Sequence, residues 1–262
     1  MQPPTDDSSD DEDKADAFMD VSHHISDGNG DVFSIIAELC YGHNNTVDLF
    51  ELCGGTAGIS KAAFKRSLSS GGNLDLTTGC DLGNPSVQQA VLHYLDTCYV
   101  LVTVVQPNCR TLGKLSNINS TLYPDSWLNH HEEDLPHIKF CGKVAAHQRS
   151  LGRYWLREQP AGTWIDSIPP WNDVVCDPDV DRCLMDQCMA GCVDDWGIPV
   201  KKRTEWTANH QALLVYLKKF QCDGSHAHST PTGKALEKLK HYPVGVCNAV
   251  VKGIIELKKD VA

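Results

Sequence analysis

Residues 46–58 read TVDLFELCGGTAG, an apolar stretch followed at once by a glycine-containing turn. Thr46–Leu52 has the composition of a buried strand, and the apolar residues of Ala57–Leu68 follow helical spacing. Glycines between a strand and a helix let the backbone approach a ligand closely, and a helix N-terminus favours polar or anionic groups. The stretch therefore predicts the first strand–turn–helix unit of an α/β fold, with a ligand at the turn. A tight turn that binds nothing is the alternative.

Strand and helix signals then alternate along the chain. Leu74–Cys80 predicts a second strand that ends at Asp81, and Tyr99–Val105 (YVLVTVV) is apolar throughout, as a central parallel strand should be. The remaining expected helices are 86–95, 144–152, 179–190 and 209–220, and the remaining expected strands are 154–157, which runs into 158–160, and 199–206. This alternation predicts an α/β fold with a doubly wound, mostly parallel sheet.

The charge is unevenly distributed over the 262 residues, although the net value is −11. Residues 1–31 carry ten acidic side chains against one lysine, whereas residues 200–262 carry eleven Lys/Arg against five Asp/Glu. We expect 1–31 to be a disordered acidic tail because it has few large apolar groups. An autoinhibitory mimic of nucleic-acid phosphates is the alternative role. We expect one domain over 32–221 and a C-terminal helical extension, 222–262, packed on it.

Cysteine use and the lack of long apolar runs bear on location. Runs such as Tyr99–Val105 are too short to span a membrane, and no basic region followed by an apolar stretch opens the chain. We therefore expect an intracellular protein, located in the nucleus, without a membrane partner. The twelve cysteines are expected to be free thiols, because a disulfide framework is typical of small secreted chains.

A cysteine follows the predicted central strand, in the segment Gln106-Pro-Asn-Cys109-Arg110. In an open α/β sheet, ligands bind outside the carboxyl ends of the strands, so this position is near a ligand and not in the core. The thiolate is the reactive form, and Arg110 or a helix N-terminus would assist deprotonation. An incidental loop thiol is the alternative. By the same strand-end logic, Asp81 would accept hydrogen bonds from ribose hydroxyls.

The glycine turn also carries a family resemblance. DLFELCGGTAGIS resembles the opening motif DLFxGxGG of the cytosine-5 DNA methyltransferases, although Leu52 stands where that family usually has glycine. The resemblance implies a class I methyltransferase (Rossmann-like) fold and S-adenosylmethionine as the cofactor, with Phe50 near its adenine. The cofactor-binding residues that it implies are Asp48, Phe50, Gly54, Gly55, Asp81 and Gln106.

Two further segments extend the resemblance to the chemistry. QPNCRTLG resembles the nucleophile loop of that family, with Asn108 where a second proline is common, and Arg157-Glu158-Gln159-Pro160 resembles its Glu-Asn-Val segment. The implied catalytic residues are Cys109, whose thiolate adds to carbon 6 of cytosine and makes carbon 5 nucleophilic, and Glu158, which hydrogen-bonds the ring at N3.

The implied substrate is a base in DNA, flipped out of the stack. The arginine-rich strand of the family is not clear here. Lys201, Lys202 and Arg203 occupy its region and, with Arg110, are expected to contact phosphates, although a solvated basic stretch would look the same. The late segment YPVGVCNAV echoes the closing motif of the family. The whole pattern resembles methyltransferase-like domains of retroelement polyproteins, which implies other polyprotein domains as partners. RNA methylation, or an inactive domain that binds nucleic acid or a protein, stays open.

A cluster of metal-ligand types lies near the C-terminus. Cys222, His226 and His228 are close in sequence, and Cys183, Cys188 and Cys192 lie upstream. Structural zinc needs four such ligands, usually in tighter paired spacings. We expect packed thiols and partly exposed histidines here and no metal, with zinc as the alternative.

Overall fold

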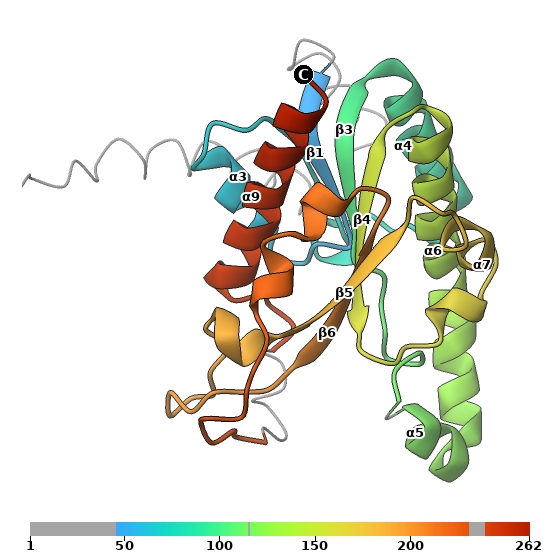
Figure 1. The fold of residues 1–262 in the computed structure, drawn as a ribbon. Helices are drawn as coiled ribbons and strands as arrows, with labels where there is room; N and C mark the ends of the chain where they lie inside the picture. The colour runs from blue at the N-terminus through green and yellow to red at the C-terminus, as the bar shows by residue number, and fades with distance from the viewer. Residues whose placement is uncertain (1–45, 115, 231–238) are drawn as a thin grey trace, which may run out of the picture.

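The computed structural model describes residues 46–114, 116–230 and 239–262, which form a six-stranded sheet with helices on both faces (Figure 1). The strand order is β2-β1-β3-β4-β6-β5. Strands β1 to β4 are parallel, and β6 runs antiparallel to both of its neighbours, β4 and β5. The strands are β1 Thr46–Leu52, β2 Ser70–Leu74, β3 Tyr99–Val105, β4 Tyr154–Pro160, β5 Asp181–Asp186 and β6 Arg203–Ala208.

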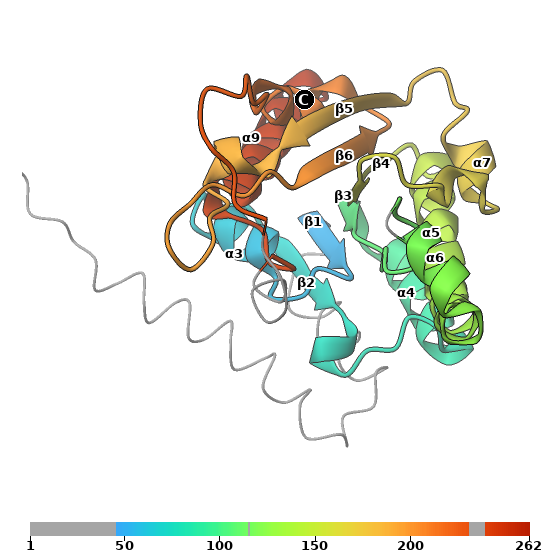
Figure 2. The same ribbon diagram turned by 90° about the horizontal axis from the view of Figure 1, so that it is seen from below.

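Two helical layers cover the sheet, and the two ribbon views agree on their placement (Figures 1 and 2). Helices α3 (Gly58–Phe64) and α9 (Val244–Asp260) lie on one face, with the 3₁₀ helices η4 (Gln211–Leu214) and η5 (Leu217–Lys219). Helices α4 (Pro85–Thr97), α6 (Pro124–Ser150) and α7 (Trp171–Val174) cover the other. The short elements α5 (Ser116–Leu122), η1 (Leu76–Thr78), η2 (Ile165–Ser167) and η3 (Gln187–Ala190) lie in connections.

The mixed α/β class and the mostly parallel sheet are confirmed. Strands β1 and β3 have the predicted bounds, and α4 occurs where a helix was expected. Their sequences are apolar throughout or strongly periodic, which are the signals that local reasoning reads best.

Three predicted elements are wrong. The second strand is Ser70–Leu74, not Leu74–Cys80, because the glycine-rich SGGNL pairs with β1 despite its low strand propensity. Residues 179–190 form β5 and η3 in place of a helix, and residues 209–220 contain η4 and η5 in place of one long helix. Pairing with β6 overrides the helical signal of the first of these segments. The helix expected over 144–152 is the end of the much longer α6, whose first half is polar and holds Pro136.

Helix α9 packs closely on the same domain as the rest of the chain. A Cβ on Gly253 would come within 2.8 Å of the Leu213 carbonyl oxygen, so only glycine lets α9 approach η4 this closely. The expected acidic tail, 1–31, lies outside the described residues. The cysteines that the structure describes are free thiols, and none of the helices in those ranges is both long and apolar enough to cross a membrane.

Candidate active site at the carboxyl ends of the strands

The glycine turn after β1 is held by the side chains of Asn73, on β2, and of Asp75, directly after this strand. The Gly54 N–H donates to Asn73 Oδ1 at 2.9 Å, and the Gly55 N–H donates to Asp75 Oδ2 at 3.0 Å. Asn73 also donates to the Gly55 carbonyl at 2.9 Å. A Cβ on Gly54 would lie 2.6 Å from Asn73 Oδ1, whereas a Cβ on Gly55 would meet nothing within 4 Å. The turn is therefore rigid on the β2 side and open at Gly55.

A buried carboxylate lies under this turn. Glu51 is fully buried, and its Oε2 accepts the Ser60 N–H at 2.6 Å. Gln106, predicted at the cofactor site, lies beside it, with Nε2 3.4 Å from Glu51 Oε1. Burial raises the pKa of Glu51 to about 7, although the hydrogen bonds from Ser60 oppose the shift. The predicted affinity of the turn for anionic groups is not supported, because Asn73 and Asp75 already occupy its amides and the nearby carboxylates are negative when ionised.

Three predicted cofactor residues lie elsewhere. Asp81 is exposed and caps the approach to α4 by accepting the Gly83 N–H at 2.8 Å, because β2 ends before it. Asp48 accepts the Ser69 N–H at 2.9 Å and pairs with Lys258 at 2.6 Å, two strand positions before Phe50. Phe50 is fully buried in the core, with its ring centroid 5.0 Å from that of Tyr94. Asp75 takes the strand-end position that Asp81 was predicted to hold.

The cysteine loop after β3 is fixed from two sides. The Asn108 N–H donates to His137 Nε2 at 3.2 Å, and the Asn108 side chain donates to Asp134 Oδ1 at 3.1 Å, both on α6. From the other side, Gln159 Nε2 donates to the Pro107 carbonyl at 2.7 Å. Proline has no N–H, so asparagine at position 108 adds a hydrogen bond that a second proline could not make.

The Cys109 thiol is half-buried and is held in its neutral form. Burial, and then the nearby Glu158 charge, raise the pKa of Cys109 to about 11, and Lys202 opposes this shift. Arg110 was predicted to assist deprotonation and to contact phosphates. It instead pairs with Asp134 and Glu133, each at 2.7 Å. The two carboxylates therefore neutralise the charge of Arg110 and hold its guanidinium against α6.

Glu158 is near enough to Cys109 for its charge to act on the thiol, and it has unused hydrogen-bonding capacity. Its side chain is on β4, the residue is 8% exposed, and Oε1 is buried without a hydrogen-bond partner. Burial raises the pKa of Glu158 despite the opposing charge of Lys202 and a hydrogen bond with Tyr242. Burial and the Glu158 charge also raise the pKa of Tyr242, with a smaller effect of Cys109. The structure thus brings Cys109 and Glu158 together, along with Tyr242 and Lys202.

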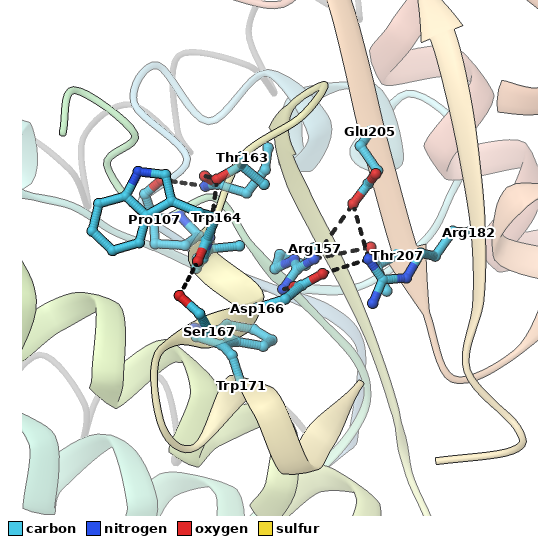
Figure 3. A network of polar contacts seen from close by, with 12 residues as sticks. Pro107, Arg157, Thr163, Trp164, Asp166, Ser167, Trp171, Arg182, Glu205 and Thr207 are labelled. Atoms are coloured by element: carbon cyan, nitrogen blue, oxygen red, sulfur yellow. Dashed lines mark hydrogen bonds and ion pairs between the residues drawn. The ribbon is translucent and has the colours of Figure 1, made fainter. Parts of the chain in front are cut away.

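The strand that carries Glu158 is anchored by its neighbour Arg157, which is fully buried and lies in a network of polar contacts (Figure 3). The Arg157 guanidinium donates to Asp166 at 2.7 Å and to Thr207 at 3.1 Å, and it lies 4.7 Å from the centre of the Trp171 ring. Arg182 pairs with the same Asp166. This network orders β4 against β6, and Glu158 lies in the part of β4 that pairs with β6.

The predicted basic patch is divided. Lys201 and Arg203 are exposed, and Arg203 lies 4.0 Å from Asp186. Lys202 is half-buried, donates to the Leu239 carbonyl at 3.0 Å and lies 5.8 Å from the centre of the Tyr242 ring. Lys202 therefore faces the Cys109–Glu158 group, and only its two neighbours are available to solvent.

Sequence reasoning missed Glu51, Asn73, Asp75 and Tyr242. An acid directly after Asn73-Leu74 was the available signal for Asp75, but the glycines of β2 obscured the strand. No local signal brings Tyr242 to Glu158, because that contact depends on the tertiary fold. No model of a known protein family matches the sequence, and neither does any curated protein.

Proposed function

We propose that this domain transfers a methyl group from S-adenosylmethionine to carbon 5 of cytosine in DNA, through a covalent adduct with Cys109. The observation that carries the proposal is the convergence of Cys109 with Glu158, a buried carboxyl group that has an unpaired oxygen, at the carboxyl ends of β3 and β4. A flipped base needs both a nucleophile and a ring-binding carboxyl group within reach.

The glycine turn favours a cationic cofactor over a dinucleotide. A pyrophosphate needs free backbone N–H groups, whereas those of Gly54 and Gly55 are already bonded to Asn73 and Asp75. S-adenosylmethionine carries a sulfonium and an ammonium group, which suit a site with Glu51 and Asp75 nearby. The open space at Gly55 gives room for it. The strand order, with β6 antiparallel between β4 and β5, resembles that of class I methyltransferases and supports the same assignment.

The reaction would use the residues as follows. When bound, S-adenosylmethionine supplies an electrophilic methyl group. The Cys109 thiol first releases its proton to solvent, and the resulting thiolate forms a bond to carbon 6 of the cytosine. Glu158 in its neutral form donates its proton to N3 and keeps the electron pair of its O–H bond. Carbon 5 becomes nucleophilic and would accept the methyl group, while the electron pair of the broken methyl–sulfur bond stays on the sulfur of the demethylated cofactor. A proton-accepting group then removes the proton from carbon 5, and Cys109 leaves carbon 6 as the thiolate. N3 returns its proton to Glu158. The raised pKa of Glu158 favours the proton-donating form.

Lys202 and Tyr242 would prepare this pair. Lys202 is the cation that stabilises the Cys109 thiolate, and Tyr242 orients Glu158 by hydrogen bonding. The resting thiol has a pKa of about 11, and its thiolate would form more readily beside the neutral form of Glu158, because that form places no negative charge beside the sulfur.

Trapping with 5-fluorocytosine tests the proposal. Fluorine blocks loss of the carbon 5 substituent, so an active enzyme with S-adenosylmethionine should form a DNA–protein adduct that survives denaturing electrophoresis. Cys109→Ser should form none, while Cys176→Ser, which changes an exposed cysteine elsewhere, should react like the original chain. Adduct on a single-stranded RNA of the same sequence but not on DNA would move the substrate class to RNA. Absence of adduct on both would refute the proposed chemistry.

A second candidate is an inactive domain that binds a nucleic acid or a protein. The neutral resting thiol and the pairing of Arg110 with Asp134 favour it. It predicts binding of DNA, measured by fluorescence anisotropy, with neither S-adenosylmethionine consumption nor adduct.

A further inference from the structure

A second group of reactive side chains lies away from the proposed active site. The donor atoms of Cys188, Cys222, His226 and His228 all lie within 4.8 Å of one another. Cys222 Sγ is 3.4 Å from His228 Nε2 and 3.8 Å from His226 Nε2. Cys188 and Cys222 are within hydrogen-bonding reach of each other. We propose that these four residues bind a structural zinc ion.

The geometry fits the tetrahedral preference of zinc. Zinc–sulfur bonds of about 2.3 Å and zinc–nitrogen bonds of about 2.0–2.1 Å place the sulfur and nitrogen donors of one tetrahedron about 3.6 Å apart. The two sulfur–nitrogen distances around Cys222 lie on either side of that value. Two thiolates and two imidazoles complete the coordination shell and leave no open position, so the site is structural and not catalytic.

The surrounding backbone prepares the ligands. The Gly224 N–H points to Cys222 Sγ at 3.4 Å, which stabilises a thiolate, and the Cys222 N–H donates to Asp186 Oδ2 at 3.0 Å. The Asp186 N–H in turn donates to the Phe220 carbonyl at 2.8 Å, so the end of β5 holds the chain on both sides of Gln221. This pairing brings Cys188, which is on η3 directly after β5, to the three ligands grouped in sequence.

The spacing along the sequence led us to expect no metal here, but the fold brings four donor atoms together. Cys183 and Cys192, the other upstream thiols, are buried outside the cluster. The zinc would also tie down the 222–228 loop, whose neighbour Ser229 donates its N–H to the Pro199 carbonyl at 2.8 Å. That contact places the site beside the segment that carries Lys202.

Metal analysis of the purified chain tests the site. Protein expressed with zinc and purified without chelator should contain about one zinc per chain by mass spectrometry of the metal. Cys188→Ser and Cys222→Ser should lose it, while Cys192→Ser, four residues from Cys188 and outside the cluster, should keep it. Zinc retained in both ligand variants, or lost equally in Cys192→Ser, would overturn the assignment.

A measurement on the unaltered chain covers variants that fail to fold. Titration with an organomercurial, read with a zinc-sensitive dye, should release about one zinc per chain as the cysteine thiols react. Cobalt substitution should give the absorption bands of a tetrahedral site with thiolate ligands. A chain that takes up neither zinc nor cobalt after refolding with either ion, or that isolates with a Cys188–Cys222 disulfide and no metal, would contradict the proposal.

Discussion

The two halves of the strand-end region differ in how their polar groups are satisfied. In the glycine-turn half, Gly54 and Gly55 donate to Asn73 and Asp75, and Glu51 accepts from Ser60. In the cysteine half, one oxygen of Glu158 is buried without a partner.

This difference indicates which half still has a polar group that a substrate can hydrogen-bond. A closed hydrogen-bond network is a preorganised shape, and its open side at Gly55 gives space for a ligand without any rearrangement. A buried, unpaired carboxyl oxygen costs free energy that a hydrogen bond from a substrate would recover. The glycine turn therefore suits a cofactor that binds without any rearrangement of the turn. The cysteine half suits a nucleobase that exchanges protons with Glu158.

Replacement of Glu158 should give the largest effect. Glu158→Gln keeps hydrogen bonding to the ring but cannot donate a carboxyl proton, so we expect methyl transfer to slow by about 100-fold or more. Glu158→Ala should lose more, because the ring contact is lost too. Cofactor affinity, measured by isothermal titration calorimetry, should not change in either variant, since Glu51 and the turn are untouched. If the cofactor affinity fell by the same factor as the rate of methyl transfer, the two halves would have to form one site.

The second change fills the open side of the turn. Gly55→Leu should weaken S-adenosylmethionine binding by about 100-fold or more, because its side chain enters space that no protein atom occupies within 4 Å of the Cβ. The matched control is Gly55→Ala, which has the same backbone strain at φ 55° but a single methyl group. Equal affinities for the alanine and leucine variants would remove this space from the cofactor site.

The comparison also shows what the sequence could reveal. Strands β1 and β3 were predictable because they are apolar throughout, and the rule that ligands bind at strand ends placed Cys109 and Glu158 in one region. Asp75 was missed because the strand before it contains two glycines and is recognised only through its pairing with β1. The sequence alone does not distinguish Cys188 from the two other upstream thiols. The contact between Asp186 and Cys222, which depends on the tertiary fold, is what brings Cys188 to the cluster.

The third prediction concerns the stability contribution of Glu51. Its folded-state pKa is about 7 and its ordinary value is 4.5, so between these pH values the folded chain binds the proton that the unfolded chain has lost. This contribution makes stability fall as pH rises from 4.5 to 7, by on the order of 3 kcal/mol. Glu51→Gln should remove that slope. In urea unfolding, the free energy of unfolding of the variant should therefore rise relative to that of the original chain between pH 5 and pH 8. A constant difference over this range would contradict the assignment of the shift to burial of Glu51.

The smallest expected effect belongs to Lys202, whose charge lowers the pKa of Cys109 against burial and the Glu158 charge. Alkylation of Cys109 by iodoacetamide should rise about tenfold per pH unit from pH 8 to pH 10, because the thiolate is a small fraction of the total below a pKa of about 11. The exposed Cys176, followed by mass spectrometry in the same digest, serves as the reference for reagent reactivity.

Removal of Lys202 acts on Cys109 by two routes of opposite sign. Lys202→Met takes away a cation that stabilises the thiolate, but it also favours the neutral form of Glu158, which reduces the negative charge beside the sulfur. The Glu158→Gln background removes the second route. Within that background, Lys202→Met should slow Cys109 alkylation by a few-fold at pH 9, while Glu158→Gln alone should accelerate it. An unchanged rate in the double variant would mean that Lys202 holds Leu239 and Tyr242 in place without tuning the thiol, and the cysteine half would then rely on its substrate alone for activation.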